Sequence, residues 1–349
     1  MNKWLGIDVG GANIKVADGC GFAASRSFPL WQKPDKLAHE IRSLIADAPA
    51  CDRIAATMTG ELADCYETKR EGVESIVAAI EKASDGKHTR IYLTNGKLVT
   101  PEIARREPLL AAASNWHALA TFACSYLGDC KNGMLIDIGS TTTDLIPLSS
   151  DGPTAKGATD TERLEHGELV YTGVRRNPVC SVVREVPYRD LLIPVAGELF
   201  ATMLDVYIIM GDLAEDPASR ATADSRPATK GGSRARLARM ICADSDIFNH
   251  RDAVQIAKHV ADEHLQMIVG RAKVAWTETS PPEKIILGGS GESISAAVAK
   301  ALGWTNTVSL RQELNAKVST CGPAHAVAVI ASGKASVDRS SSESGENGS

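Results

Sequence analysis

A short pattern that occurs twice, near the N-terminus and again in mid-chain, constrains the fold of this chain more than any other feature. The first copy reads WLGIDVGGANIK, from Trp4 to Lys15, and the second reads LIDIGSTTTDL, from Leu135 to Leu145. When the copies are overlaid, three pairs of positions coincide: Asp8 with Asp137, Gly10 with Gly139, and Lys15 with Asp144. Each copy predicts a buried strand that ends in an acidic residue, a tight glycine turn and a polar return strand.

Two such β-turn-β elements facing one another would form a cleft lined by backbone N–H groups and carboxylates. Concave arrays of N–H groups bind anions, and hard carboxylate oxygens bind Mg²⁺. The repeat therefore predicts a site for a phosphate chain together with a metal ion. The alternative is that each aspartate only caps its own turn. The duplication favours the functional interpretation.

Composition excludes several classes of partner. With 349 residues, of which 44% are hydrophobic, the chain can bury a full core and is long enough for two domains. A net charge of −5 gives no general attraction to nucleic acid or to an anionic membrane. The longest apolar run, Leu199–Met210, is interrupted by Asp205 and is too short to span a bilayer. No secretory signal opens the chain, so a cytoplasmic location is expected. A homodimer is compatible with the sequence.

Strand and helix patterns alternate along the chain, which predicts layered α/β architecture. Leu109–Leu127 is expected to form one long helix, and a second helix is expected over Gly197–Leu213. The segment that follows, Ala214–Arg236, is rich in Pro, Ser, Gly and charged residues, and predicts a mobile surface insertion. Residues 333–349 are rich in Ser, Gly and Glu and predict a disordered tail.

The strand ends carry the residues with the clearest chemical meaning. One Mg²⁺ held by Asp8 and Asp137 would neutralise a phosphate group, and Lys15 would contact a phosphate oxygen as a point charge. A solvated strand lysine is an equally good interpretation of Lys15. Glu61 follows the strand pattern of Arg53–Met58, which places it at the edge of a sheet where α/β proteins bind ligands. It would act there as a metal ligand or general base, or as a helix N-terminal carboxylate without a catalytic role.

Two further loops contribute weaker signals. Gly288-Gly289-Ser290-Gly291 follows an apolar strand and allows the backbone to approach a ligand closely. Arg175 and Arg176 place two guanidinium groups on a loop, where they match the oxygens of a carboxylate or a phosphate. Surface salt bridges are the alternative for this pair. No Walker P-loop and no Gly-x-Gly-x-x-Gly fingerprint is present, which disfavours a dinucleotide enzyme. No histidine is assigned to catalysis.

These motifs resemble those of a known superfamily. Gly6–Lys15, Leu135–Pro147 and Ile285–Gly291 resemble the phosphate-1, phosphate-2 and adenosine motifs of the actin-like ATPases. The stretches Thr57–Asp64, Asn115–Ala118 and Tyr171–Pro178 are similar to those of its hydantoinase A/oxoprolinase-like members. Within that group they look closest to the branch linked to tetrahydromethanopterin-dependent one-carbon metabolism, which includes the methanofuran-core synthases. The resemblance covers residues 1–332, apart from the insertion at 214–236.

The resemblance implies a duplicated, ribonuclease H-like α/β fold with two lobes around a central cleft, residues 1–130 and residues 131–332. It also implies a transferase that joins an aminomethylfuran-methyl diphosphate to the phenol of a tyramine or tyrosine derivative and releases pyrophosphate. For this reaction we hypothesise that Asp8, Glu61 and Asp144 are the catalytic residues and that Asp8 and Asp137 are the Mg²⁺ ligands. Arg175 and Arg176 would bind the acceptor's carboxylates. The implied diphosphate-binding positions are Gly10, Gly11, Lys15, Gly139, Ser140, Thr141, Gly288 and Gly289.

Two other classes of function use the same cleft. An ATP-dependent kinase or oxoprolinase-like hydrolase of a small metabolite would bind Mg-ATP through the same aspartates. A nucleotide-binding protein without turnover would bind ATP and release no product. The third motif, residues 287–292, lacks obvious residues for recognising an adenine ring, which favours a small diphosphate donor.

Overall fold

The two copies of the repeated pattern form matching hairpins in the computed structural model, which describes residues 3–333. In the first hairpin, β1 (Trp4–Gly10) pairs antiparallel with β2 (Asn13–Ala17), and Asp8 lies opposite Lys15. In the second, β7 (Asn132–Ile138) pairs with β8 (Thr143–Ser149), and Asp137 lies opposite Asp144. The overlay of the two sequence motifs is therefore also a structural equivalence. The expected tail lies outside the described residues, apart from Gly333.

Each hairpin belongs to a sheet with the same strand order. The first sheet runs β3-β2-β1-β4-β5-β6 and the second runs β10-β8-β7-β13-β14, so five successive strands correspond in order and in direction. This confirms the expected duplicated α/β fold of the actin-like type. The other strands are β3 (Ala23–Ser27), β4 (Arg53–Thr59), β5 (His88–Tyr92), β6 (Leu98–Val99), β9 (Gly152–Pro153), β10 (Leu169–Val170), β13 (Lys284–Gly288) and β14 (Thr307–Ser309).

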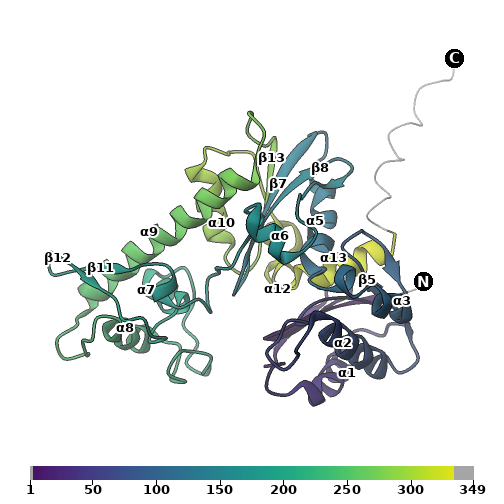
Figure 1. The fold of residues 1–349 in the computed structure, drawn as a ribbon, viewed down its shortest axis with the longest axis horizontal. Helices are drawn as coiled ribbons and strands as arrows, with labels where there is room; N and C mark the ends of the chain where they lie inside the picture. Colours follow the sequence, from purple (N-terminus) through teal and green to yellow (C-terminus); the bar gives the residue numbers. More distant parts are fainter. Residues whose placement is uncertain (1–2, 334–349) are drawn as a thin grey trace.

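Helices cover both sheets and fill the space between them (Figure 1). The N-terminal lobe carries its helices on the outer face of the first sheet: α1 (Leu37–Asp47), α2 (Lys69–Ser84), α3 (Pro101–Arg106) and α4 (Pro108–Ala111), after the 3₁₀ turn η1 (Pro34–Lys36). The second lobe carries α6 (Asp160–Glu165), α9 (His250–Ala275), α10 (Glu292–Ala301), α11 (Leu310–Leu314) and α12 (Ala316–Thr320).

Two helices that are far apart in the sequence join the lobes. α5 (Asn115–Ala123), followed by the 3₁₀ turn η2 (Cys124–Tyr126), packs against α13 (Gly322–Ala331). Although α13 is the last helix of the described chain, it packs on β1 and β4 of the first sheet. One hydrophobic cluster contains residues of both helices together with Tyr92 of the first sheet and Leu135 of the second. The floor between the lobes is thus a continuous core.

Residues 179–249 form an inserted subdomain, seen at the left of Figure 1 and joined to the second lobe by the long helix α9. It contains the 3₁₀ turn η3 (Val179–Ser181), the hairpin of β11 (Glu185–Tyr188) and β12 (Leu191–Pro194), and the helices α7 (Met203–Met210) and α8 (Lys230–Arg239). Helix α7 is shorter than the helix expected over residues 197–213, because a capping box at Thr202 starts it and Gly211, with a φ of 88°, ends it.

The expectation of an irregular insertion over Ala214–Arg236 was wrong for its C-terminal part, which forms the first turns of α8. Arg236 is completely buried and forms ion pairs with Asp205 at 2.7 Å and with Asp224 at 2.9 Å. The charges of the segment predicted exposure, which is wrong for Arg236. Within residues 3–333, none of the helices combines the length and the apolar character needed to cross a bilayer.

Candidate functional site

The two acidic strand ends, one from each sheet, lie within electrostatic range of one another. Asp8 is buried, and desolvation raises its pKa to about 6, against the lowering effect of the Lys15 ammonium. Desolvation also raises the pKa of Asp137 to about 7, and the nearby carboxylates of Asp144, Asp8 and Glu292 act in the same direction. Lys15 opposes them. The structure therefore brings the predicted aspartates and lysine from two lobes into one electrostatically coupled group.

Glycine turns surround this group, as the sequence motifs predict. The turn after β7 is tight, with the Gly139 N–H donating to the Thr142 carbonyl at 2.8 Å. At the third motif, Gly289 has a φ of 84°, and a Cβ there would lie 2.7 Å from Oδ1 of Asp137. Only glycine fits at this point, because the positive φ disfavours other residues and a Cβ would also lie 2.2 Å from the Ile138 carbonyl oxygen. The Gly288-Gly289 turn thus borders the acidic group directly.

The donor set fits a magnesium ion shared with a phosphate chain. Oδ1 of Asp8 is buried and has no hydrogen-bond partner among the described residues. A buried carboxylate oxygen without a partner is costly unless a cation or donor meets it. The described residues contain no cluster of three or more side chains arranged to hold a metal by themselves. Mg²⁺ commonly takes only one or two carboxylates and completes its shell with water and substrate phosphates, which is what Asp8 and Asp137 would offer.

Asp144, the second predicted acid of the β7–β8 hairpin, is already engaged. It forms a buried ion pair with Arg163 of α6, whose guanidinium also contacts Asp160 at 3.2 Å. The same guanidinium lies 4.2 Å from the ring centre of Trp116. Burial raises the pKa of Asp144 and the Arg163 charge opposes that shift. Because a paired carboxylate is a poor proton acceptor, this arrangement disfavours Asp144 as the general base.

The surroundings of Glu61 differ from those of the ion-paired Asp144. Its side chain is 1% exposed and its Oε2 has no hydrogen-bond partner among residues 3–333. Desolvation is the largest cause that raises the pKa of Glu61 to about 7, with a further contribution from Asp160 across the cleft. The Lys69 charge and the backbone N–H of Ala113 lower it. Glu61 is therefore a carboxylate with a free oxygen and an affinity for protons near neutral pH.

The backbone beside Glu61 departs from the expected helix. The helix expected over Leu109–Leu127 is broken into α4 and α5, and Ala113 between them has a φ of 48°. The hydroxyl groups of Ser114 and Thr57 of β4 lie 2.8 Å apart, which ties the start of α5 to the first sheet. The backbone N–H of Ala113 is one of the groups that lower the pKa of Glu61, so the break between the two helices lies beside this carboxylate.

The loop from Tyr171 to Asn177 packs on the second glycine turn. The Val174 N–H donates to the Gly139 carbonyl at 3.1 Å, and the Arg175 and Arg176 N–H groups both donate to the Ser140 carbonyl. Gly173 lies so close that a Cβ there would be 2.7 Å from the Thr141 nitrogen. This contact explains the glycine and fixes the loop beside the turn.

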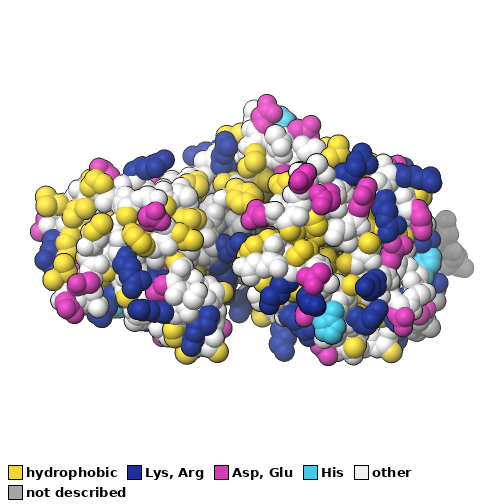
Figure 2. Space-filling model, turned by 60° about the horizontal axis from the view of Figure 1, so that its bottom comes forward, with side chains coloured by type: hydrophobic (Ala, Val, Ile, Leu, Met, Phe, Trp, Pro, Cys, Tyr) yellow, Lys and Arg dark blue, Asp and Glu magenta, His cyan; other side chains and the backbone are white. Residues whose placement is uncertain are grey.

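The two arginines of this loop do not act as a pair. Arg175 is exposed and lies within electrostatic range of Asp216 of the inserted subdomain. Arg176 instead lies over the ring of Trp31 in the N-terminal lobe, with its guanidinium carbon 5.3 Å from the ring centre. Figure 2 shows the surface hollowed between the inserted subdomain and the rest of the molecule, with Lys and Arg side chains along the hollow.

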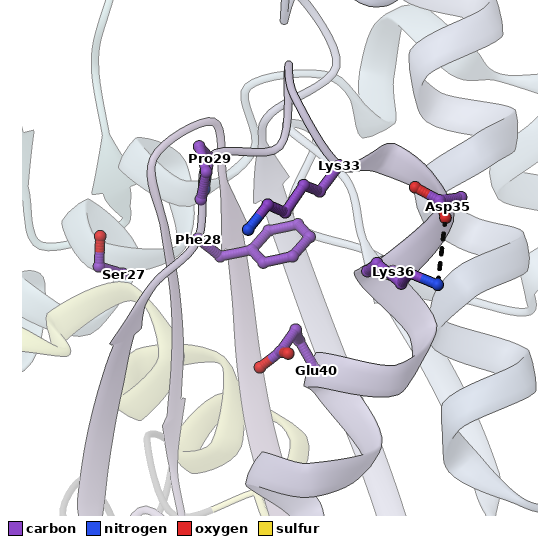
Figure 3. Close-up of a pocket in the computed structure, with 7 residues that line it drawn as sticks. All are labelled: Ser27, Phe28, Pro29, Lys33, Asp35, Lys36 and Glu40. Carbon is purple, nitrogen blue, oxygen red and sulfur yellow. Dashed lines mark ion pairs between the residues drawn. The ribbon is translucent and has the colours of Figure 1, made fainter.

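A separate cavity of about 390 Å³ lies on the N-terminal lobe, between β3 and α1 (Figure 3). Its carboxylates already have partners, since Asp35 contacts Lys36 at 3.5 Å and Glu40 contacts Arg26 at 3.1 Å. None of the predicted catalytic residues lines this cavity. The candidate site is therefore the cleft floor and not this depression.

Three contributors to the cleft were missed by the sequence analysis: Trp31, Asp160 and Arg163. None of the three lies in a recognisable sequence motif, and each is positioned by contact with an element that is distant in the sequence. A weak signal exists for Arg163, because the capping box at Thr159 predicts the start of a helix that carries it. His117, which the sequence analysis left without a catalytic role, has its Nδ1 2.9 Å from the Tyr92 hydroxyl and its pKa lowered to about 4 by burial.

Known proteins are similar in sequence to this chain over most of its length. Residues 52–332 match the hydantoinase/oxoprolinase family. A protein of Methanocaldococcus jannaschii, named (4-{4-[2-(gamma-L-glutamylamino)ethyl]phenoxymethyl}furan-2-yl)methanamine synthase, is 32% identical over 93% of this chain and 96% of its own. A protein of the same name from Methanococcus vannielii is 30% identical over 57% of this chain and 90% of its own. Component A of (R)-2-hydroxyglutaryl-CoA dehydratase from Acidaminococcus fermentans superimposes with a TM-score of 0.46 at 13% identity, covering 96% and 99% of the two chains.

Proposed function

Because this chain belongs to the hydantoinase/oxoprolinase family, we propose that its cleft performs the reaction for which its methanogen relatives are named. The name of those relatives describes a phenoxymethyl-furan product. The corresponding step joins a phenol oxygen to the exocyclic carbon of an aminomethylfuran-methyl diphosphate. One C–O bond forms, the carbon–diphosphate bond breaks, and the phenolic proton leaves. Two observations support this proposal: the electrostatic coupling of Asp8, Asp137 and Lys15, and the hydrogen bond from the Gly60 N–H, next to Glu61, to the Val9 carbonyl of β1 at 3.0 Å.

In the proposed mechanism the cleft has a diphosphate end and a proton-accepting end. Lys15 and the N–H groups of the glycine turns hold the diphosphate and stabilise the charge that develops on it. Mg²⁺, bound through Asp8 and Asp137, would supply further charge neutralisation. Glu61 accepts the proton of the phenol through its free Oε2. Arg163 holds Asp144 and Asp160 in place between the two ends.

A pyrophosphate-release assay tests the reaction directly. With Mg²⁺, an aminomethylfuran-methyl diphosphate and a tyramine or tyrosine derivative, we expect pyrophosphate and an aryl ether in equal amounts, without ATP. Mass spectrometry identifies the ether and shows which acceptor is used. Cleavage of ATP to ADP with no ether would instead support a kinase or oxoprolinase-like hydrolase. Tight ATP binding without any product would support a nucleotide-binding protein.

Acceptor recognition gives a second expected result. We propose that Arg175, which is exposed on the loop and is not stacked on Trp31, binds a carboxylate of the acceptor. Replacing it (Arg175→Gln) should raise the KM for the acceptor about tenfold, because a hydrogen bond to a charged group is lost. The KM for the diphosphate donor should stay within about twofold. Steady-state kinetics with each substrate varied in turn measure both values, and an equal rise in both would contradict the assignment.

A further inference from the structure

Arg176 and Trp31 make a contact between the lobes that no sequence motif predicts. Arg176 lies on the loop beside the second glycine turn, and Trp31 follows the strand β3 of the N-terminal lobe. The guanidinium carbon lies 5.3 Å from the centre of the Trp31 ring, within the range of a cation–π interaction. This contact joins segments that are far apart in the sequence.

Each partner is attached to one of the two glycine turns by main-chain hydrogen bonds. The segment before Trp31 is bound to the first turn, with the Phe28 N–H donating to the Ala12 carbonyl at 2.9 Å and the Leu30 N–H donating to the Gly11 carbonyl at 3.0 Å. The Arg176 N–H donates to the Ser140 carbonyl of the second turn at 3.0 Å. The side-chain contact therefore spans the two turns that line the cleft.

The stacking leaves the hydrogen-bonding capacity of Arg176 unused. A guanidinium contacts an aromatic ring through its face, whereas its N–H donors lie in the plane at its edge. Its side chain donates no hydrogen bond and forms no ion pair within the described part of the chain. Arg176 is exposed rather than enclosed by protein. The Arg176 guanidinium, with free N–H donors beside the two glycine turns, matches an oxyanion such as a diphosphate.

We propose that Trp31 is a positioning residue of the diphosphate site and acts through Arg176. Its ring holds the guanidinium between the two glycine turns, where the edge N–H groups meet the oxygens of the diphosphate. This inference rests on the proposed function, because it takes the cleft to be a diphosphate site. It gives the two arginines different ligands: Arg175 binds the acceptor and Arg176 binds the diphosphate.

Calorimetric titration of the full chain with inorganic pyrophosphate and Mg²⁺ tests the role of Trp31 without requiring turnover. Trp31→Leu should weaken pyrophosphate binding about threefold to tenfold, as expected for loss of a cation–π contact. Trp31→Phe, which keeps an aromatic face, should retain most of the affinity. Arg176→Gln should weaken binding further, because the charge itself is lost. The double variant should be no weaker than Arg176→Gln alone, because Trp31 acts only through that side chain.

A second cation–π contact provides a matched control. Arg53 lies 5.5 Å from the ring centre of Trp4, at the start of the first sheet. Trp4→Leu removes the same kind of contact away from the glycine turns, so its affinity for pyrophosphate should equal that of the wild type. Thermal melting of every variant confirms that each chain is folded.

Three results would overturn the proposal. Unchanged affinity in Trp31→Leu, an additive double variant, or an equal loss in Trp4→Leu would show that Trp31 does not position Arg176 for the ligand. In these cases the wild type still binds pyrophosphate, and the proposed function stands. A wild-type chain that does not bind Mg-pyrophosphate would overturn both this inference and the proposed diphosphate cleft.

Discussion

Asp8→Asn is expected to lower kcat by about a hundredfold or more while the protein stays folded. The substitution keeps the shape of the side chain but removes the negative charge that would hold Mg²⁺ beside Asp137. Losing a single electrostatic stabiliser of developing charge costs about two to three orders of magnitude in rate. Turnover is measured by pyrophosphate release at saturating donor and acceptor.

Stability measurements distinguish a functional loss from a folding defect in Asp8→Asn. Asp8 is 4% exposed, and its Oδ1 has no hydrogen-bond partner among residues 3–333. Removing an unsatisfied buried charge without changing volume should not lower the free energy of unfolding, as for other sites where function opposes stability. A folded Asp8→Asn chain with the wild-type rate would refute the proposed cleft.

Glu61→Gln is expected to lower kcat by about a hundredfold to ten-thousandfold, the usual contribution of a general base. Because burial raises the pKa of Glu61 to about 7, the wild-type rate should rise with pH through about 7 and level off above it. The residual activity of Glu61→Gln should lack this dependence. A pH–rate profile that keeps the same inflection in Glu61→Gln would assign the base to another group. Asp144→Asn serves as the comparison, because Asp144 was the other candidate and is paired with Arg163.

Glu61→Gln should also change the stability of the protein by an amount that varies with pH. Between the usual pKa of 4.5 and the folded value of about 7, the folded state keeps a proton that the unfolded chain has released. The free energy of unfolding of the wild type therefore falls as pH rises through this window. Above pH 7 the Glu61→Gln variant should be more stable than the wild type by roughly 3 kcal/mol, and below pH 4 this pH-dependent advantage should be gone. Urea denaturation at several pH values measures the difference.

Much of the fold was readable from local sequence. The repeated apolar-Asp-x-Gly pattern predicted two equivalent hairpins, and the register of Asp8 with Lys15 and of Asp137 with Asp144 confirms them. Such a pattern is informative because a strand's alternation and a glycine turn are both short-range properties. The position of Glu61 at the carboxyl end of β4 also follows from local order. Its catalytic role stays a prediction.

Long-range contacts determine the features of the fold that local sequence did not predict. The apolar residues of Leu109–Leu127 favour a continuous helix, but the helix is broken at Ala113, where Ser114 contacts Thr57 of the first sheet. Likewise, the charges of residues 214–236 suggest exposure, but Arg236 is buried and forms an ion pair with Asp205. Local propensity is worth only fractions of a kcal/mol per residue, so a tertiary contact can override it.

The duplicated fold, the pair of acidic strand ends and the family could be predicted from the sequence, because each of these is encoded in contiguous residues. Which carboxylate keeps a free oxygen depends on contacts that form only in the folded chain. The sequence offers both Asp144 and Glu61 as proton acceptors, yet Arg163 binds Asp144, while Glu61 keeps an unpaired oxygen in a desolvated site. The tertiary structure also separated Arg175 from Arg176, because the partners that divide them, Asp216 and Trp31, come from different parts of the chain. The ionisation and orientation of a side chain depend on neighbours in space, and those neighbours exist only once the chain has folded.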